Sequence, residues 1–176
     1  MRRSSIDHSS ATPTKKKFTI VFGTQSGTSE HVAKQLRSKM KETFKKCTDL
    51  SQDIKISVVA GDGTSPEKIV KRVNDSCVSL FVTCTFGNGE FPSSMQDFWK
   101  HLNTCKEGTL GSTKYSVLGL GSSMYADFME ELFNRAAKQL DLKLEELGGQ
   151  RIEPIGLCDD LDRNNYRDGF EKWMAS

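Results

Sequence analysis

The chain has 176 residues, of which 36% are hydrophobic and 27% charged, as is typical of one globular domain. No apolar run approaches the roughly 18–20 residues that span a bilayer, and the opening residues contain no apolar signal segment, so we expect neither a membrane segment nor secretion. The five cysteines have no C-x-x-C spacing, which argues against a disulfide framework or a metal site and predicts a reducing, cytoplasmic location.

The net charge of +2 is unevenly distributed. Residues 1–17 hold five cations and one carboxylate, are rich in Ser and Thr, and show no hydrophobic period, so they are predicted to be a disordered basic tail. The domain is predicted at 18–176, and it contains ten acids against four cations between residues 125 and 162. A domain with this excess of negative charge binds nucleic acid poorly and favours a basic protein partner.

Short apolar runs alternate with segments of helical period. The runs that predict strands are FTIVFG (18–23), IKISVVAG (54–61), VSLFVTC (78–84), KYSVLGL (114–120) and RIEPIGL (151–157). Pro154 places the last of these strands at a sheet edge, because proline cannot donate to the ladder.

Each run is followed by apolar residues three or four positions apart, which predicts a helix after every strand. The helical faces are Val32, Leu36, Met40 and Phe44; Ile69 and Val73 behind Ser65-Pro66; Met95, Phe98 and Leu102; Leu132, Ala136, Leu140, Leu144 and Leu147 up to Gly148-Gly149; and Tyr166, Phe170 and Trp173. Strands buried on both faces and joined by helices predict an α/β, doubly wound, five-stranded parallel sheet with helices on both faces.

In such a sheet, ligands bind beyond the carboxyl ends of the strands. The first of these ends carries hydroxyls and glycine over residues 23–30, followed directly by a helix, and no Lys or Arg lies between Gly23 and Ala33. Free N–H groups at a helix start can hold a phosphate there with neutral donors only. An ordinary polar turn that caps the helix explains the same residues equally well.

Two further loops carry aromatic residues next to glycines. Phe86 lies in T-F-G-N-G-E, and Tyr125 ends L-G-L-G-S-S-M-Y after the next strand. Because these two strands are expected to be neighbours, the two rings could sandwich a planar molecule. Each loop read alone is also compatible with an ordinary strand-to-helix connection.

Five motifs in this order carry a family resemblance: T-Q-S-G-T, T-F-G-N-G-E, L-G-L-G-S-x-x-Y, L-E-E-L-G-G-Q-R-I and G-L-C-D-D. The chain resembles the flavodoxin-like FMN domain of the diflavin reductases, which include the reductase of the microsomal haem monooxygenases, the reductase half of nitric oxide synthases and the sulfite reductase flavoprotein. The resemblance runs from Phe18 to about Trp173. It implies FMN as the cofactor.

The resemblance also implies the residues that bind FMN. The residues expected to bind the phosphate are Thr24, Gln25, Ser26, Gly27, Thr28 and Ser29. One face of the flavin ring is expected to contact Cys84, Thr85, Phe86 and Gly87, with Asn88 and Gly89 completing a movable turn, and the other face Leu120, Gly121, Ser122, Ser123, Met124 and Tyr125. Phe133, Asn134 and Asp160 are expected beside the flavin. The segment 126–132 is longer than the family usually shows, so either Phe128 or Phe133 could take the family's Phe position.

The function implied is electron transfer. An FAD/NADPH-binding reductase domain, in cis or in trans, would supply electrons, and the FMN domain would pass them singly to a haem or another one-electron acceptor. The acceptor is expected to dock on acids of the cofactor loops: Glu90, Asp159, Asp160 and Asp162, with Asp127, Glu130 and Glu131 beside them.

No catalytic residue or metal ligand is predicted, and the chain alone is not expected to oxidise NADPH. Three alternatives stay open: a stand-alone flavodoxin, the flavodoxin-like module of a radical enzyme that modifies tRNA, and a scaffold that has lost FMN.

Overall fold

A computed structural model of the chain describes residues 15–47, 53–125 and 129–176, without the side chains of Tyr125 and Glu130. Its strands are β1 (Lys16–Gly23), β2 (Ile54–Ala60), β3 (Val78–Cys84), β4 (Lys114–Gly121), β5 (Gln150–Arg151) and β6 (Gly156–Asp159). They form one parallel sheet in the order β2-β1-β3-β4-β5, and β6 also pairs with β4. The predicted doubly wound sheet is confirmed.

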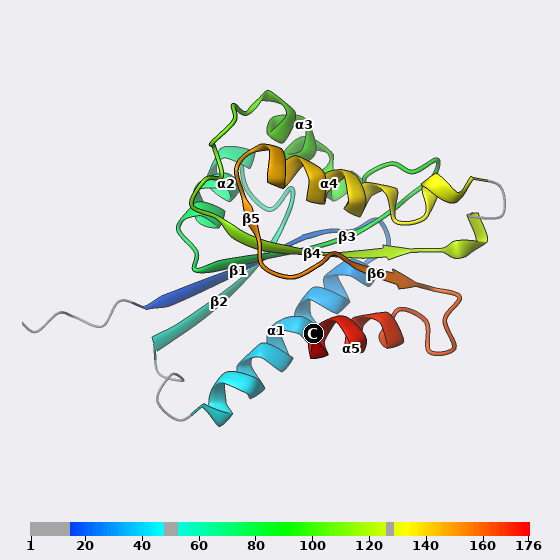
Figure 1. Cartoon of the computed structure of the whole chain (residues 1–176), viewed down its shortest axis with the longest axis horizontal. Coiled ribbons are helices and arrows are strands. Elements are labelled where there is room, and N and C mark those ends of the chain that lie inside the picture. Colours follow the sequence, from blue (N-terminus) through cyan, green and yellow to red (C-terminus); the bar gives the residue numbers. More distant parts are fainter. Residues whose placement is uncertain (1–14, 48–52, 126–128) are drawn as a thin grey trace, which may run out of the picture.

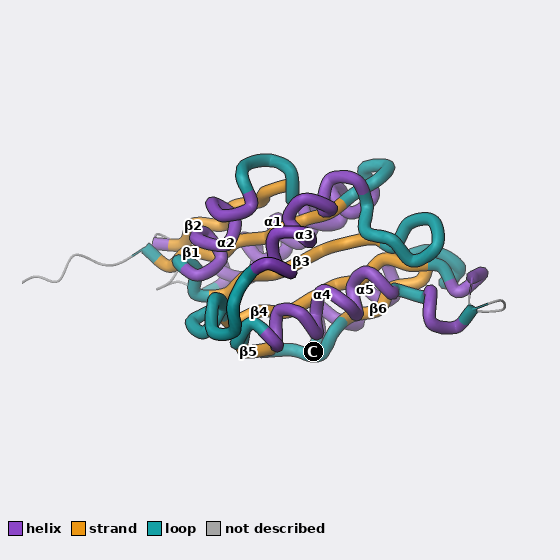
Figure 2. Tube along the Cα trace, turned by 90° about the horizontal axis from the view of Figure 1, so that it is seen from above, coloured by secondary structure: helices purple, strands orange, loops and turns teal. Residues whose placement is uncertain are grey.

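Helices cover both faces of this sheet (Figure 1). On one face lie α2 (Pro66–Asn74), α3 (Gln96–Thr104) and α4 (Arg135–Glu146), and on the other lie α1 (Thr28–Lys46) and α5 (Arg167–Ala175). Figure 2 shows the sheet from above, with α2, α3 and α4 over it. The central strands are apolar along most of their length because each face packs against a helical layer.

The last strand differs from its prediction, because the segment 151–157 is divided into β5 and β6. Pro154 lies between the two pieces and has no N–H to donate to the ladder. The neighbouring carbonyl of Glu153 accepts a hydrogen bond from the Ser116 hydroxyl on β4 instead, at 3.2 Å. Pairing with β4 then resumes at Gly156.

Two predicted boundaries also change. Strand β1 starts at Lys16, opposite Ile54 of β2, so Lys16 and Lys17 of the predicted tail belong to the sheet. Residues 1–14 of that tail lie outside the described residues. Helix α4 begins at Arg135 rather than near Leu132, which lies in a short 3-10 turn (Glu130–Leu132). The predicted end of α4 is confirmed at Gly148, whose φ of 91° favours glycine.

No helix within the described ranges combines the length and the apolar character needed to cross a membrane. The five cysteines are all free.

A charged network fixes β5 to α4. The Arg151 guanidinium donates to the buried Asp141 carboxylate at 2.8 Å and to the exposed Glu145 carboxylate at 3.1 Å. The bond to Asp141 raises the pKa of Arg151 above its ordinary value. The Tyr115 hydroxyl donates to the backbone carbonyl of Asp141 at 2.9 Å, and burial raises the pKa of Tyr115.

Because Asp141 is the buried partner in this network, Asp141→Asn is expected to lower the free energy of unfolding by about 2 kcal/mol. Glu145→Gln removes the same charge from the exposed partner and should cost less than about 1 kcal/mol. Urea unfolding of both variants measures the difference. Equal losses would show that the burial of Asp141 does not matter.

Candidate cofactor site

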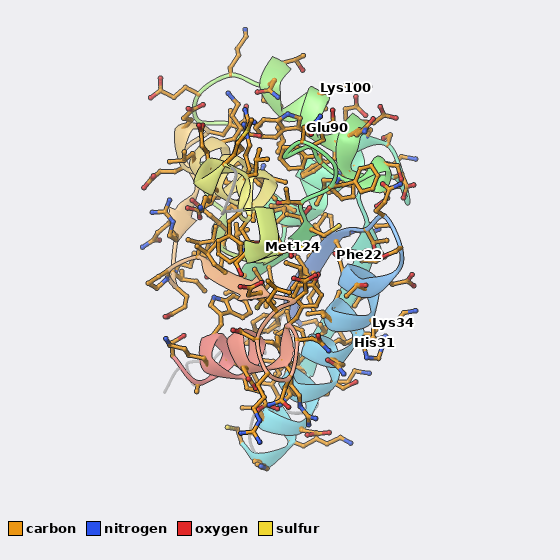
Figure 3. All side chains as sticks on the ribbon, turned by 90° about the vertical axis from the view of Figure 1, so that its right-hand side faces the viewer. Phe22, His31, Lys34, Glu90, Lys100 and Met124 are labelled. Atoms are coloured by element: carbon orange, nitrogen blue, oxygen red, sulfur yellow. The ribbon has the colours of Figure 1, made fainter. Side chains whose placement is uncertain are left out.

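The carboxyl ends of β1, β3, β4 and β6 place the predicted loops at one end of the sheet, on the right of Figure 1. Figure 3 looks onto this end and shows Glu90 from the loop after β3, Met124 from the loop after β4 and Phe22 of β1 together in one view. Parallel strands bring their loops together in this way, so the structure gathers segments that are more than 100 residues apart in the chain.

The loop after β1 is shaped to hold an anion. The Thr24 hydroxyl accepts the Gly27 N–H at 2.8 Å, and Gly27 has a φ of 96°. No described residue accepts a hydrogen bond from the N–H groups of Thr28, Ser29 or Glu30, as expected for the first turn of a helix. The Ser29 hydroxyl is 0% exposed and also has no partner among the described residues. These unpaired donors fit a phosphate group.

Two serines missed at the sequence level hold this loop. The Ser94 hydroxyl accepts the N–H of Thr24 at 2.8 Å and donates to the carbonyl of Thr24 at 3.0 Å. The Gln25 side-chain oxygen accepts the N–H of Ser93 at 2.9 Å. Ser93 and Ser94 directly follow the loop after β3, so they connect the predicted phosphate loop to the predicted ring loop. Gln25 is predicted to contact phosphate, but its side-chain oxygen accepts this hydrogen bond from Ser93 instead.

The loop after β3 forms a narrow closed turn. Phe86 and Glu90 exchange both backbone hydrogen bonds, at 2.9 and 2.8 Å, and Gly87 and Gly89 have φ of 52° and 91°. The Phe86 ring is 48% exposed and is therefore available to a planar ligand. Asn88 at the tip of the turn is exposed as well.

The residues that flank these loops form hydrogen bonds and core contacts within the protein. The Thr85 hydroxyl accepts the Ala136 N–H at 3.2 Å, and the Thr85 N–H donates to the carbonyl of Leu120 at 3.0 Å. The Leu120 side chain is buried in the core, and the half-buried Cys84 packs against the same cluster. Only the backbone of Leu120 can therefore face a ligand.

The loop after β4 is held by Asp159, the last residue of β6, and by Asp160, which follows it. The Asp159 carboxylate accepts the N–H groups of Ser123 at 2.9 Å and Leu161 at 3.1 Å. Burial opposes ionisation of Asp159, but these hydrogen bonds outweigh it and lower its pKa. The Asp160 N–H donates to the carbonyl of Gly121, while one Asp160 carboxylate oxygen is buried without a partner among the described residues, as is the Ser122 hydroxyl.

Met124 is exposed at the same end. The Tyr125 side chain and Phe128 lie outside the described residues, so the second stacking ring stays a prediction.

The predicted pair Phe133 and Asn134 is divided by the structure. Asn134 is 0% exposed and donates to the Cys158 carbonyl at 3.1 Å, beneath β4 and β6. It therefore supports the site from below and does not face the loops. The half-buried Phe133 ring lies 5.6 Å from the Lys138 amine.

The predicted acids are on this end, although the charge is mixed. Glu90, Glu131 and Asp162 are exposed, and Asp159 and Asp160 are half-buried. Asp127 and the side chain of Glu130 lie outside the described residues. The exposed Arg135 and Arg163 interrupt the acidic surface.

Comparison with known proteins identifies the family of this fold. The flavodoxin family model matches residues 20–173. The chain is 34% identical to the mitochondrial pyruvate dehydrogenase [NADP(+)] of Euglena gracilis, over 94% of this chain and 8% of that protein. It is 32% identical to NADPH-dependent diflavin oxidoreductase 1 of Dictyostelium discoideum, over 90% of this chain and 22% of that protein.

A solved structure, a cysteine mutant of the flavodoxin from Pseudomonas aeruginosa, superposes with a TM-score of 0.68 at 23% identity, over 90% of this chain and 94% of that one. Sulfite reductases and nitric oxide synthases also match, which confirms the predicted resemblance. The chain spans 8% to 26% of the length of these curated relatives.

Proposed function

Since the chain belongs to the flavodoxin family, whose members bind FMN, we propose that it is an electron-transfer module that receives electrons from an FAD/NADPH reductase module and delivers them singly to an acceptor. Bound FMN would supply the one-electron chemistry. The observation that carries the proposal is the unpaired donor set after β1, at the same end of the sheet as the exposed Phe86.

The residues of the chain would divide the work of binding. The N–H groups of the first turn of α1, with the Ser29 hydroxyl and the exposed Thr28 hydroxyl, would hold the phosphate without a cation. Phe86 and Tyr125 would cover the two ring faces and exclude water. The closed turn at Gly87 and Gly89 would place a backbone group against the ring edge.

The relatives favour a multidomain setting, because the chain matches about a quarter or less of their length and one of them is a diflavin oxidoreductase by name. The reductase module would then act in cis or in trans, and the free cysteines agree with a cytoplasmic location. A stand-alone flavodoxin is the second candidate, because the superposed structure is one.

Release of the cofactor tests the proposal. The purified chain, reconstituted with flavin and then denatured, should release one FMN per chain, identified by chromatography. Recovery of FAD, or a chain that binds no flavin, would overturn the assignment. Measurement of electron transfer from a separately purified FAD/NADPH module then tests the supply of electrons.

Ser94→Ala should weaken FMN binding by about five- to tenfold, because it removes two hydrogen bonds that hold the backbone of Thr24. Fluorescence titration measures the loss. Ser38→Ala is the matched control. The exposed Ser38 hydroxyl donates to a backbone carbonyl within its own helix α1, so this substitution should change the affinity for FMN less than about twofold. An unchanged affinity in Ser94→Ala would show that the loop holds its shape unaided.

Docking of the acceptor is expected to depend on exposed acids of this end. Glu131→Lys combined with Asp162→Lys should slow reduction of cytochrome c by the pre-reduced protein and flatten its salt dependence, since exposed charges are screened beyond about 8 Å. Glu42→Lys combined with Glu107→Lys makes the same charge change elsewhere. Stopped-flow rates over a salt series compare the two. If both double variants reduce cytochrome c equally slowly, the net charge of the protein and not the position of these acids would explain the lower rate.

A further inference from the structure

A basic groove lies at the opposite end of the sheet from the cofactor loops. It is a hollow of about 350 Å³ lined by residues of β1, β2 and α2, near the amino ends of both strands. The three elements lie side by side in Figures 1 and 2. Its charged residues are Lys17, Lys55, Lys68, Lys71, Arg72 and Asp75. Its floor is polar, with the buried Thr19 and Ser76 hydroxyls 2.8 Å apart. Five exposed cations thus surround one carboxylate.

The fold holds these cations in unfavourable proximity. Lys17 and Lys55 are directly opposite in the register of β1 and β2, where like charges repel. Lys68, Lys71 and Arg72 are spaced i, i+3 and i+4 on α2, which is also repulsive. None of the five forms an ion pair with a described residue, whereas α1, α4 and α5 each pair a cation with an acid. An external anion would relieve both repulsions.

From this arrangement we propose that the basic groove docks a carboxylate-rich, extended segment of a partner protein. Four of the five cations are lysines, which act as hydrated point charges and not as the bidentate forks that shape a site for one small anion. No aromatic residue lines the groove, so the bases of a single-stranded nucleic acid would find no stacking surface.

The edge of the sheet gives the segment a second mode of contact. Among the described strands β2 pairs with β1 alone, so its outer backbone groups pair with no other described strand, and a further strand can pair there. Lys55 projects into the groove from this edge strand. A partner held here would leave the cofactor loops free, so the module could stay tethered while its flavin end meets donor and acceptor. The docking itself does not depend on FMN.

Charge reversal at matched positions tests the proposal. The probe is a fluorescein-labelled decapeptide of alternating Glu and Thr, and its binding to the full chain in low-salt buffer is followed by fluorescence anisotropy. The variant K68E/K71E/R72E should bind it at least about tenfold more weakly. The control K41E/K45E/K46E reverses three exposed cations on α1 and should stay within about twofold.

The milder variant K68Q/K71Q controls for loss of the fold. It should weaken binding of the peptide about threefold while its circular dichroism spectrum stays unchanged. Equal weakening in the α1 control would overturn the proposal, since net charge alone would then explain binding. Binding of sodium tripolyphosphate or oligo-dT that is tighter than the peptide and lost in K68E/K71E/R72E would also overturn it. Self-association lost in the same variant would assign the groove to a second copy instead.

Discussion

Ser29→Ala is expected to weaken FMN binding by about ten- to a hundredfold while changing riboflavin binding less than about twofold. The Ser29 hydroxyl is buried in the first turn of α1 with no partner among the described residues, and it lies beside the open N–H groups of that turn. A hydrogen bond to a charged group is worth about 1.5–3 kcal/mol. Riboflavin lacks the phosphate, so titration with both ligands isolates that bond.

The stability of the cofactor-free protein provides the control for Ser29. Removing a buried, unpaired hydroxyl relieves a desolvation cost, so Ser29→Ala should unfold in urea at the same or a higher concentration than the original chain. Thr28→Ala removes the neighbouring exposed hydroxyl and should follow the same ligand pattern with a smaller loss. Equal losses for FMN and riboflavin would mean that Ser29 acts on the ring or on the fold and not on phosphate.

The features predicted well from sequence are those that a local period records. Val32, Leu36 and Met40 recur at helical spacing, and short, mostly apolar runs such as 78–84 are found in strands covered on both faces. Once the sheet is parallel, its topology brings the loops after β1, β3 and β4 to one end. Fold and site location therefore follow from patterns within single segments.

The features that escaped prediction depend on contacts between distant segments. Ser94 fixes Thr24 across 70 positions of sequence, and nothing in P-S-S marks that bond in advance. Leu120 stands inside a glycine-rich loop motif, yet it is buried because β4 is covered on both faces. The division between β5 and β6 arises from how the chain around Pro154 meets β4. A proline predicts an edge but does not say where pairing resumes.

Asn134→Ala is expected to lower the free energy of unfolding by about 3 kcal/mol. Asn134 has a left-handed backbone with φ of 54°, which alanine adopts at a cost of roughly 1–2 kcal/mol. Its amide also donates to the carbonyl of Cys158 at 3.1 Å, and the loss of such a hydrogen bond costs about 0.5–1.5 kcal/mol. Urea unfolding of the cofactor-free protein measures the sum.

Asn134→Gly separates the two contributions, because glycine accepts the left-handed backbone and loses only the side chain. It should recover about 1 kcal/mol relative to Asn134→Ala. Since Asn134 lies beneath Gly119 and Gly121 of β4, both variants should weaken FMN and riboflavin equally, in contrast to Ser29→Ala. Unchanged stability together with a selective loss of FMN would instead make Asn134 a direct contact of the cofactor.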